Sequence, residues 1–252
     1  MADQAPPASA TEPRRRSQTL DIIRGALVVL MVVFHAAYIA SMYGLATVDL
    51  GSGFWWIFPR GIAAGFVAVS GWSLASKRER GGRLGDYVRR AARLAIPALA
   101  VSLVSFVALG RNFVFFGVLH LLAVSSVLAW PLLGRPALAL AAGILVFAAG
   151  LVLGPVRFDW PWLAWLGFRP SGLYPADYLP LLPWFAWVAF GSAARDLASA
   201  WLSRRPRPDQ APWSPPRALR PLAFLGRHSL WAYLIHLPLL YGLGWLVAMV
   251  VS

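Results

Sequence analysis

Long apolar runs recur along the whole chain, and they constrain the fold more than any other feature. A helix needs about 20 apolar residues to cross ~30 Å of hydrocarbon at ~1.5 Å per residue. Such runs lie near 22–43, 54–76, 91–109, 113–133, 136–156, 179–201 and 229–250. Hydrophobic residues make up 59% of the 252 residues, and the mean hydropathy is +0.62. The sequence therefore predicts an all-α, polytopic transmembrane bundle of about seven spans.

The net charge of +13 is explained by where the positive residues fall. If successive spans alternate in direction, 19 of the 23 Lys and Arg residues lie on one side of the membrane. Positive residues gather on the cytoplasmic side. This distribution predicts a cytoplasmic N-terminus, an external C-terminus and no nucleic-acid partner. The chain has no cysteine, which excludes disulfides and thiolate chemistry.

Three segments outside the spans have distinct compositions. Residues 1–18 lack apolar periodicity and are expected to form a disordered cytoplasmic tail ahead of a single transmembrane domain, 19–252. Within that domain we expect a Pro- and Arg-rich cytoplasmic loop at 202–228 and an external, aromatic, interfacial segment at 157–178. A signal peptide is the alternative for residues 14–40, but the apolar run is too long and no cleavage pattern follows it. An uncleaved first helix is expected.

The stretch "TLDIIRGALVVLMVVFHAAY", residues 19–38, places three polar side chains on a predicted span. Arg24 and His35 are eleven residues apart, which puts them within ~20° on a helix, and Asp21 lies close to the same stripe. The rise of ~16 Å puts Arg24 at the cytoplasmic boundary and His35 near the midplane. A neutral imidazole there can act as a base. The alternatives are an interhelical hydrogen bond for His35 and a snorkelling position for Arg24.

Other polar residues at or inside the predicted spans are candidates for lining a site. His120 and His236 lie in the fourth and last spans, so three histidines could converge in the bundle. Ser70 precedes a glycine in the second span, and Asp177 and Tyr178 open the sixth from outside. Each has a structural alternative: hydrogen bonds between helices for the histidines, close packing for the serine and a cap on the sixth helix for the aspartate.

Five blocks in order resemble the transmembrane acyltransferases typified by heparan-alpha-glucosaminide N-acetyltransferase, including its bacterial relatives. They are "LDIIRGALVVLMVVFH" at 20–35, "FVAVSG" at 66–71, "FFGVLHLLAVS" at 115–125, "DYLPLLPWF" at 177–185 and "LGRHSLWAYLIHLPLL" at 225–240. The spacing from Arg24 to His35 is also similar to the first-helix motif of the membrane O-acyltransferases of bacterial glycans, whose histidine is taken as catalytic. The chain is several spans shorter than the eukaryotic N-acetyltransferase, which has an asparagine at the place of His35.

The resemblance implies an enzyme of the bacterial cytoplasmic membrane with a cytosolic acyl-CoA, most simply acetyl-CoA, as co-substrate. The acyl group would pass to an amine or hydroxyl of a glycan or lipid-linked sugar on the far side, with direct transfer favoured over an acyl-histidine. The implied site consists of His35 as the catalytic base, of Asp21, Arg24 and Ser70 for the donor, and of His120, Asp177, Tyr178 and His236 for the substrates. No metal ion is expected, and a homodimer is compatible with the sequence.

Two other classes of protein stay open at this point. A haem or metal redox protein could use the three histidines in the spans as ligands, and a Soret band or elemental analysis would reveal it. A transporter could use the buried ionisable groups as a substrate path, but the two matched halves typical of many transporters are not visible in the sequence.

Overall fold

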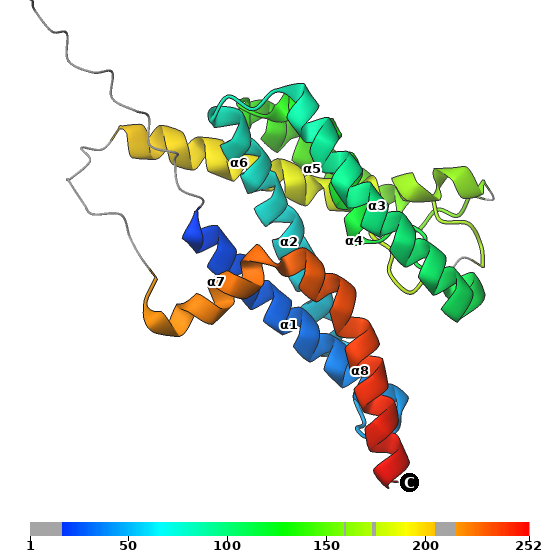
Figure 1. Cartoon of the computed structure of the whole chain (residues 1–252). Coiled ribbons are helices and arrows are strands. Elements are labelled where there is room, and N and C mark those ends of the chain that lie inside the picture. The colour runs from blue at the N-terminus through cyan, green and yellow to red at the C-terminus, as the bar shows by residue number, and fades with distance from the viewer. Residues whose placement is uncertain (1–16, 159, 173–174, 205–214, 252) are drawn as a thin grey trace, which may run out of the picture.

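The computed structural model describes residues 17–158, 160–172, 175–204 and 215–251, which form helices joined by short connections (Figure 1). The long helices are α1 (Gln18–Met42), α2 (Gly53–Glu79), α3 (Leu84–Leu109), α5 (Pro136–Leu153), α6 (Leu181–Ser203) and α8 (Ser229–Val251). The shorter ones are α4 (Val118–Leu128), α7 (Arg220–Arg227) and the 3-10 turns η1 (Gly110–Asn112), η2 (Trp130–Leu132), η3 (Pro161–Leu166) and η4 (Arg217–Leu219). The predicted all-helical class is confirmed.

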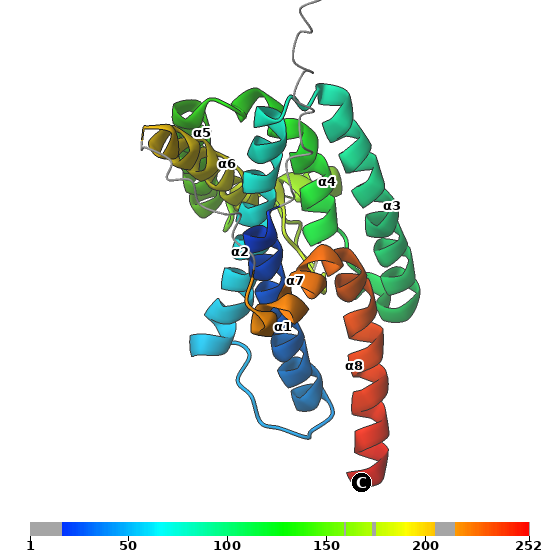
Figure 2. The ribbon, with the colours of Figure 1, turned by 60° about the vertical axis from the view of Figure 1, so that its left-hand side comes forward.

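The helices form two groups that meet at α2. One group consists of α1, α7 and α8, and the other of α3 to α6; α2 packs against α1 on one side and α6 on the other. Figures 1 and 2 show α8 beside α1, with its C-terminal end extending beyond the rest of the chain. The main core cluster lies between α2 and the second group and includes Leu74, Tyr87, Leu121 and Val188, all almost fully buried.

Glycines bring two pairs of helices into backbone contact. In the α2–α6 crossing, a Cβ built on Gly71 would overlap the carbonyl of Val188, and one built on Gly191 would overlap that of Ala68. The α1–α7 crossing repeats the arrangement: Gly25 faces the backbone of α7, and Gly226 faces the backbone of α1. Small residues allow membrane helices to approach this closely. Both crossings fix α1 and α2, the helices that carry the predicted donor-binding residues.

Five helices in the described part of the chain are long and apolar enough to cross a membrane, namely α1, α2, α3 extended by η1, α5 and α8. Two of the seven expected spans are not among them. The run at 113–133 is not one continuous helix: α4 has 11 residues, and ~16 Å of helix is too short for a bilayer core of ~30 Å. The run at 179–201 does form a 23-residue helix, α6, but it contains Arg195 and Asp196.

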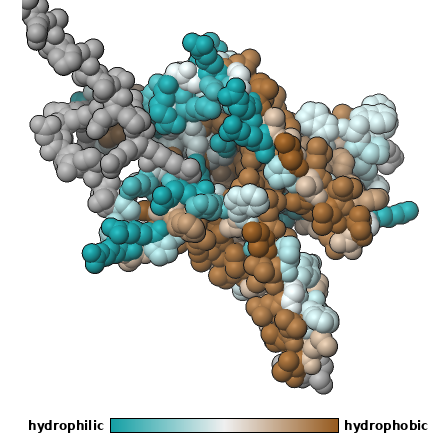
Figure 3. All heavy atoms as spheres, viewed as in Figure 1, coloured by the Kyte–Doolittle hydropathy of each residue, from teal (hydrophilic) through white to brown (hydrophobic). Residues whose placement is uncertain are grey.

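The segments between the spans also differ in part from expectation. The stretch at 202–228 is not wholly a loop, because α7 packs along α1 within it. Of the predicted tail, only Ser17 and Gln18 are described: Ser17 caps α1 by accepting the Leu20 N–H, and Gln18 is the first residue of the helix. Figure 3 shows hydrophilic residues gathered at the end that carries the α2–α3 turn and α7, and apolar residues along α8.

Candidate active site

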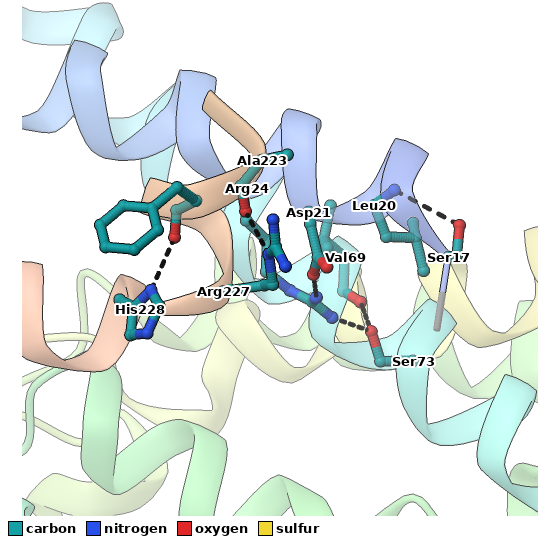
Figure 4. A network of polar contacts seen from close by, with 10 residues as sticks. Ser17, Leu20, Asp21, Arg24, Val69, Ser73, Ala223, Arg227 and His228 are labelled. Atoms are coloured by element: carbon teal, nitrogen blue, oxygen red, sulfur yellow. Dashed lines mark hydrogen bonds and ion pairs between the residues drawn. The ribbon is translucent and has the colours of Figure 1, made fainter. Parts of the chain in front are cut away.

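Arg24 is held by polar side chains from its own helix and from α2. Its guanidinium donates to Asp21 Oδ1 at 3.1 Å and, through a second nitrogen, to Ser73 Oγ. Asp21 is 2% exposed, and Ser73 in turn donates to the carbonyl of Val69. Figure 4 shows the Arg24 side chain reaching from α1 to α2. The predicted common face of Asp21 and Arg24 is thus used for an ion pair.

A second arginine binds the same face of α2 from α3. Arg90 donates from Nη2 to Ser70 Oγ at 3.0 Å and from Nε to Ser126 Oγ of α4 at 3.2 Å. Ser70 and Ser73 are three residues apart and therefore share a helix face. The charges of Arg24 and Arg90 are close enough to interact. We call this group the arginine layer; it comprises Asp21, Arg24, Ser70, Ser73, Arg90 and Ser126.

The sequence analysis included Ser70 in the donor site but missed Ser73, Arg90 and Ser126. Arg90 was treated as one of the many positive residues that set the topology. In the structure Arg90 follows the fully buried Tyr87 by three residues and so lies on the inward face of α3. Its neighbour Arg89 points outward and is exposed.

His35 and His236 come together deeper in the bundle, on α1 and α8. Their ring centroids are 4.8 Å apart with an edge-to-face orientation. His35 Nδ1 lies 2.8 Å from the carbonyl oxygen of Met31, and His236 Nδ1 lies 2.7 Å from that of Tyr233. A carbonyl can only accept, so in both rings Nδ1 carries the hydrogen and Nε2 of the neutral ring carries the lone pair. We call these two residues the histidine pair.

One basic nitrogen of the histidine pair has no hydrogen-bond partner among the described residues. His236 is 7% exposed, and its Nε2 has no hydrogen-bond partner among the described residues. A buried polar atom without a partner is costly, and such atoms gather where a protein binds or reacts. The described residues contain no cluster of three potential ligands for a metal ion. The two rings are in direct contact, a geometry that does not fit a haem iron held between them.

His120 does not join the histidine pair. It lies on α4, with Nε2 3.3 Å from Ser102 Oγ of α3 and its ring 5.5 Å from that of Phe116. Its Nδ1 is buried without a partner among the residues that the structure describes. The structure therefore brings two of the three predicted histidines together and places the third against α3.

Asp177 caps a different helix from the one predicted. Its Oδ2 accepts the N–H of Val118, the first residue of α4, and the hydroxyl of Tyr233 of α8, both at 3.2 Å. The N-cap position of α6 is held by Pro180, and no side chain caps that helix. The predicted cap on the sixth helix is therefore wrong. Burial raises the pKa of the Asp177 carboxyl, and its two hydrogen bonds act in the opposite direction.

Tyr178 points away from these residues. Its hydroxyl donates to the carbonyl of Ala164 in η3 at 2.6 Å, and it lines a cavity of about 250 Å³ together with Arg157, Arg169 and Trp184. This cavity lies on the side that the charge distribution predicts to be external. Residues 177 and 178 thus belong to two neighbouring environments rather than to one site.

Comparison with known proteins agrees with the blocks that the sequence analysis identified. The sequence profile of the family described as heparan-alpha-glucosaminide N-acetyltransferase, catalytic, matches residues 16–238, which include the arginine layer and the histidine pair. No curated protein and no solved structure matches the chain significantly. Because the match covers most of the sequence, the chain belongs to the heparan-alpha-glucosaminide N-acetyltransferase catalytic family.

Proposed function

We propose that this protein transfers an acyl group, most simply acetyl, from cytosolic acyl-CoA to an amine or hydroxyl of a glycan or lipid-linked sugar across the bacterial cytoplasmic membrane. Its family consists of membrane acetyltransferases, which supports the reaction class and the co-substrate. One observation carries the proposal for the site. The same helix, α1, contributes Arg24 to a group of anion-binding side chains and His35 to a pair of bases, about 16 Å further along.

The arginine layer has the chemistry to bind the donor. Guanidinium groups donate hydrogen bonds to phosphate oxygens, and the CoA moiety carries several phosphates. Arg24 of α1 and Arg90 of α3 donate to two serines on one face of α2. Arg227 lies near Arg24 on α7 (Figure 4). We propose that Asp21 orients Arg24. Ser70 and Ser73 would hold the two arginines apart. The donor's phosphates would then lie at the cytoplasmic mouth.

The histidine pair has the chemistry for the transfer itself. His35 Nε2 removes the proton from the attacking amine or hydroxyl while the nucleophile adds to the thioester carbonyl carbon. The carbon–sulfur bond then breaks, and the proton returns from His35 to the CoA thiolate. Transfer is direct, and the products are the acylated acceptor and CoA. His236 binds or polarises the substrates beside His35, and His120 lines the substrate path from α4.

We also propose seven crossings, with a cytoplasmic N-terminus and an external C-terminus. α4 and the residues on either side of it would provide one crossing, and α6 would provide another. Reporter fusions in the α2–α3 turn should behave as cytoplasmic, and fusions after Gly154 should behave as external, because 19 of 23 positive residues fall on the first side. The opposite result would contradict both the orientation and the cytosolic access of the donor.

Incubation of the purified protein with radiolabelled acetyl-CoA and a mixed envelope extract tests the reaction. Label should appear in the glycan or lipid-linked fraction, and CoA should be released in equal amount. In sealed vesicles, an antibody that covers the cytoplasmic side of the arginine layer should abolish the transfer, because it keeps acetyl-CoA from its binding site. No transfer to any fraction, together with a Soret band or a bound metal, would replace this function with a redox one.

A further inference from the structure

Two helices that each carry a histidine meet at the carboxylate of Asp177. The N-terminus of α4 contributes the N–H of Val118, two residues before His120. Helix α8 contributes the hydroxyl of Tyr233, three residues before His236. Asp177 itself belongs to neither helix, since it lies in the segment that leads into α6. One side chain thus joins three parts of the fold that are far apart in sequence.

The place of Asp177 is closely specified. A Cβ on Gly117 would overlap Asp177 Oδ2, so that only glycine allows the carboxylate to approach the first turn of α4. The residues around it are also paired, because the Leu179 N–H donates to the carbonyl of Phe116 at 2.8 Å. The positive end of the α4 dipole favours a carboxylate at this point. Asp177 therefore has little freedom to move away from α4.

Tyr233 connects Asp177 to the histidine pair. Its hydroxyl donates to Asp177, and its main-chain carbonyl accepts the Nδ1–H of His236 at 2.7 Å. The rings of Tyr233 and His236 lie 5.8 Å apart. Rotation of α8 about its own axis would break the first bond and carry His236 away from His35. The Asp177–Tyr233 bond therefore sets the angle at which α8 presents His236.

Packing alone restrains α8 weakly. Only 6% of the residues in its most apolar window are buried inside the protein, and its principal neighbour is α1. A membrane helix with so few protein contacts can turn in lipid at low cost, because one apolar face is as well solvated as another. A single hydrogen bond therefore has a larger effect on the rotation of α8 than it would have on a helix with many protein contacts.

We propose that Asp177 is a positioning residue for acyl transfer: it fixes α8 through the hydroxyl of Tyr233 and thereby holds His236 beside His35. This inference rests on the proposed function for its effect on turnover. It does not depend on that function for its effect on the histidine pair. Asp177 and Tyr233 touch neither substrate in this proposal and act only through His236.

Two substitutions test the link. Tyr233→Phe keeps the ring and removes the hydroxyl, and Asp177→Asn keeps the shape while replacing the carboxylate by a weaker acceptor. Each should lower kcat about tenfold or more, with the KM for acetyl-CoA unchanged. The double variant should be no worse than the poorer single one, because both changes break the same bond. Tyr241→Phe, on the same helix but outside the link, is the matched control and should keep wild-type activity.

A second measurement does not require turnover. In protein labelled with ¹⁵N-histidine, NMR should show the ring of His236 as the Nδ1–H form, and Tyr233→Phe should shift its nitrogen signals while Tyr241→Phe leaves them in place. A shifted signal in a protein that transfers no acyl group would uphold the positioning and overturn the proposed function. An active wild type whose Tyr233→Phe and Asp177→Asn variants keep full kcat and unshifted signals would overturn the positioning alone. If Tyr233→Phe does not fold in a thermal-shift assay, Asp177→Asn decides.

Discussion

The arginine layer and the histidine pair differ in how far their buried polar atoms have hydrogen-bond partners. In the arginine layer both guanidinium groups have hydrogen-bond partners on neighbouring helices, and Arg24 also has a carboxylate. In the histidine pair each Nδ1 is bound to the backbone of its own helix, and His236 Nε2 has no partner among the described residues. The first region therefore satisfies its charged groups with protein partners, whereas the second leaves one basic nitrogen, His236 Nε2, without a partner among the described residues.

The largest effect should come from His35→Ala, which removes one base of the histidine pair. A general base supplies typically 10²–10⁴-fold in rate, so kcat should fall by about that factor. The affinity for acetyl-CoA, measured by calorimetry, should stay within about twofold, because no charge-assisted hydrogen bond to the donor is lost. A loss of affinity with kcat preserved would reverse the roles of the two regions.

Arg90→Ala tests the arginine layer and should act on binding instead. A charge-assisted hydrogen bond contributes about 1.5–3 kcal/mol, which corresponds to about 10- to 150-fold in the dissociation constant for acetyl-CoA. The value of kcat at saturation should change little. The control is Arg89→Ala, since that side chain is exposed beside the layer. Equal affinity of the two variants would remove Arg90 from the donor site.

Gly191→Ala leaves the side chains of the arginine layer unchanged and disturbs the α2–α6 crossing, which holds α2 in place. The new methyl group would meet the carbonyl of Ala68 and push α6 away from α2, and overpacking of this kind costs about 1–3 kcal/mol. Thermal unfolding in detergent should therefore occur at a lower temperature. Gly61→Ala is the matched control, because a Cβ at that position of α2 meets nothing within 4 Å. The opposite order of stability would contradict the close α2–α6 crossing.

The smallest effect should come from His120→Ala, because this residue lies outside the histidine pair. Removing a hydrogen bond between membrane helices costs ~0.6 kcal/mol on average, so the transfer rate should stay within about threefold of wild type. The same labelled acetyl-CoA assay measures it. A variant as inactive as His35→Ala would mean that the base is His120.

The placement of the polar residues of α1 could be predicted from the sequence, because the regular repeat of a helix fixes which of its residues share a face. The spacing of Asp21, Arg24 and His35 places them along a single face, and Asp21 and Arg24 indeed form an ion pair three residues apart. Contacts between helices could not be predicted in this way. That Arg24 meets Ser73 rather than Ser70, and that His35 meets His236, depends on rotations and crossing points that the spacing within one helix does not contain.

The same limit explains why the continuous long helix expected at 113–133 is a short helix, α4, in the structure. A helix buried in protein and a helix dissolved in lipid both need apolar residues, so the run at 113–133 carried the composition of a span. In the structure Leu119, Leu121 and Ala123 of α4 are buried, and the helix ends after 11 residues. Asp177 was assigned to the wrong helix for a related reason, since a cap from 59 residues away leaves no local pattern.

The contact between His35 and His236 also has a consequence for how the protein is made. The two residues are roughly 200 positions apart, and such contacts form late because a long stretch of chain must be ordered first. While the ribosome is still adding the residues after α6, α1 lacks the neighbours that α7 and α8 provide, and no histidine stands beside His35. Under the proposed function, acyl-CoA that meets such a nascent chain finds only half of the histidine pair, so the chain stays inactive until α8 has been made.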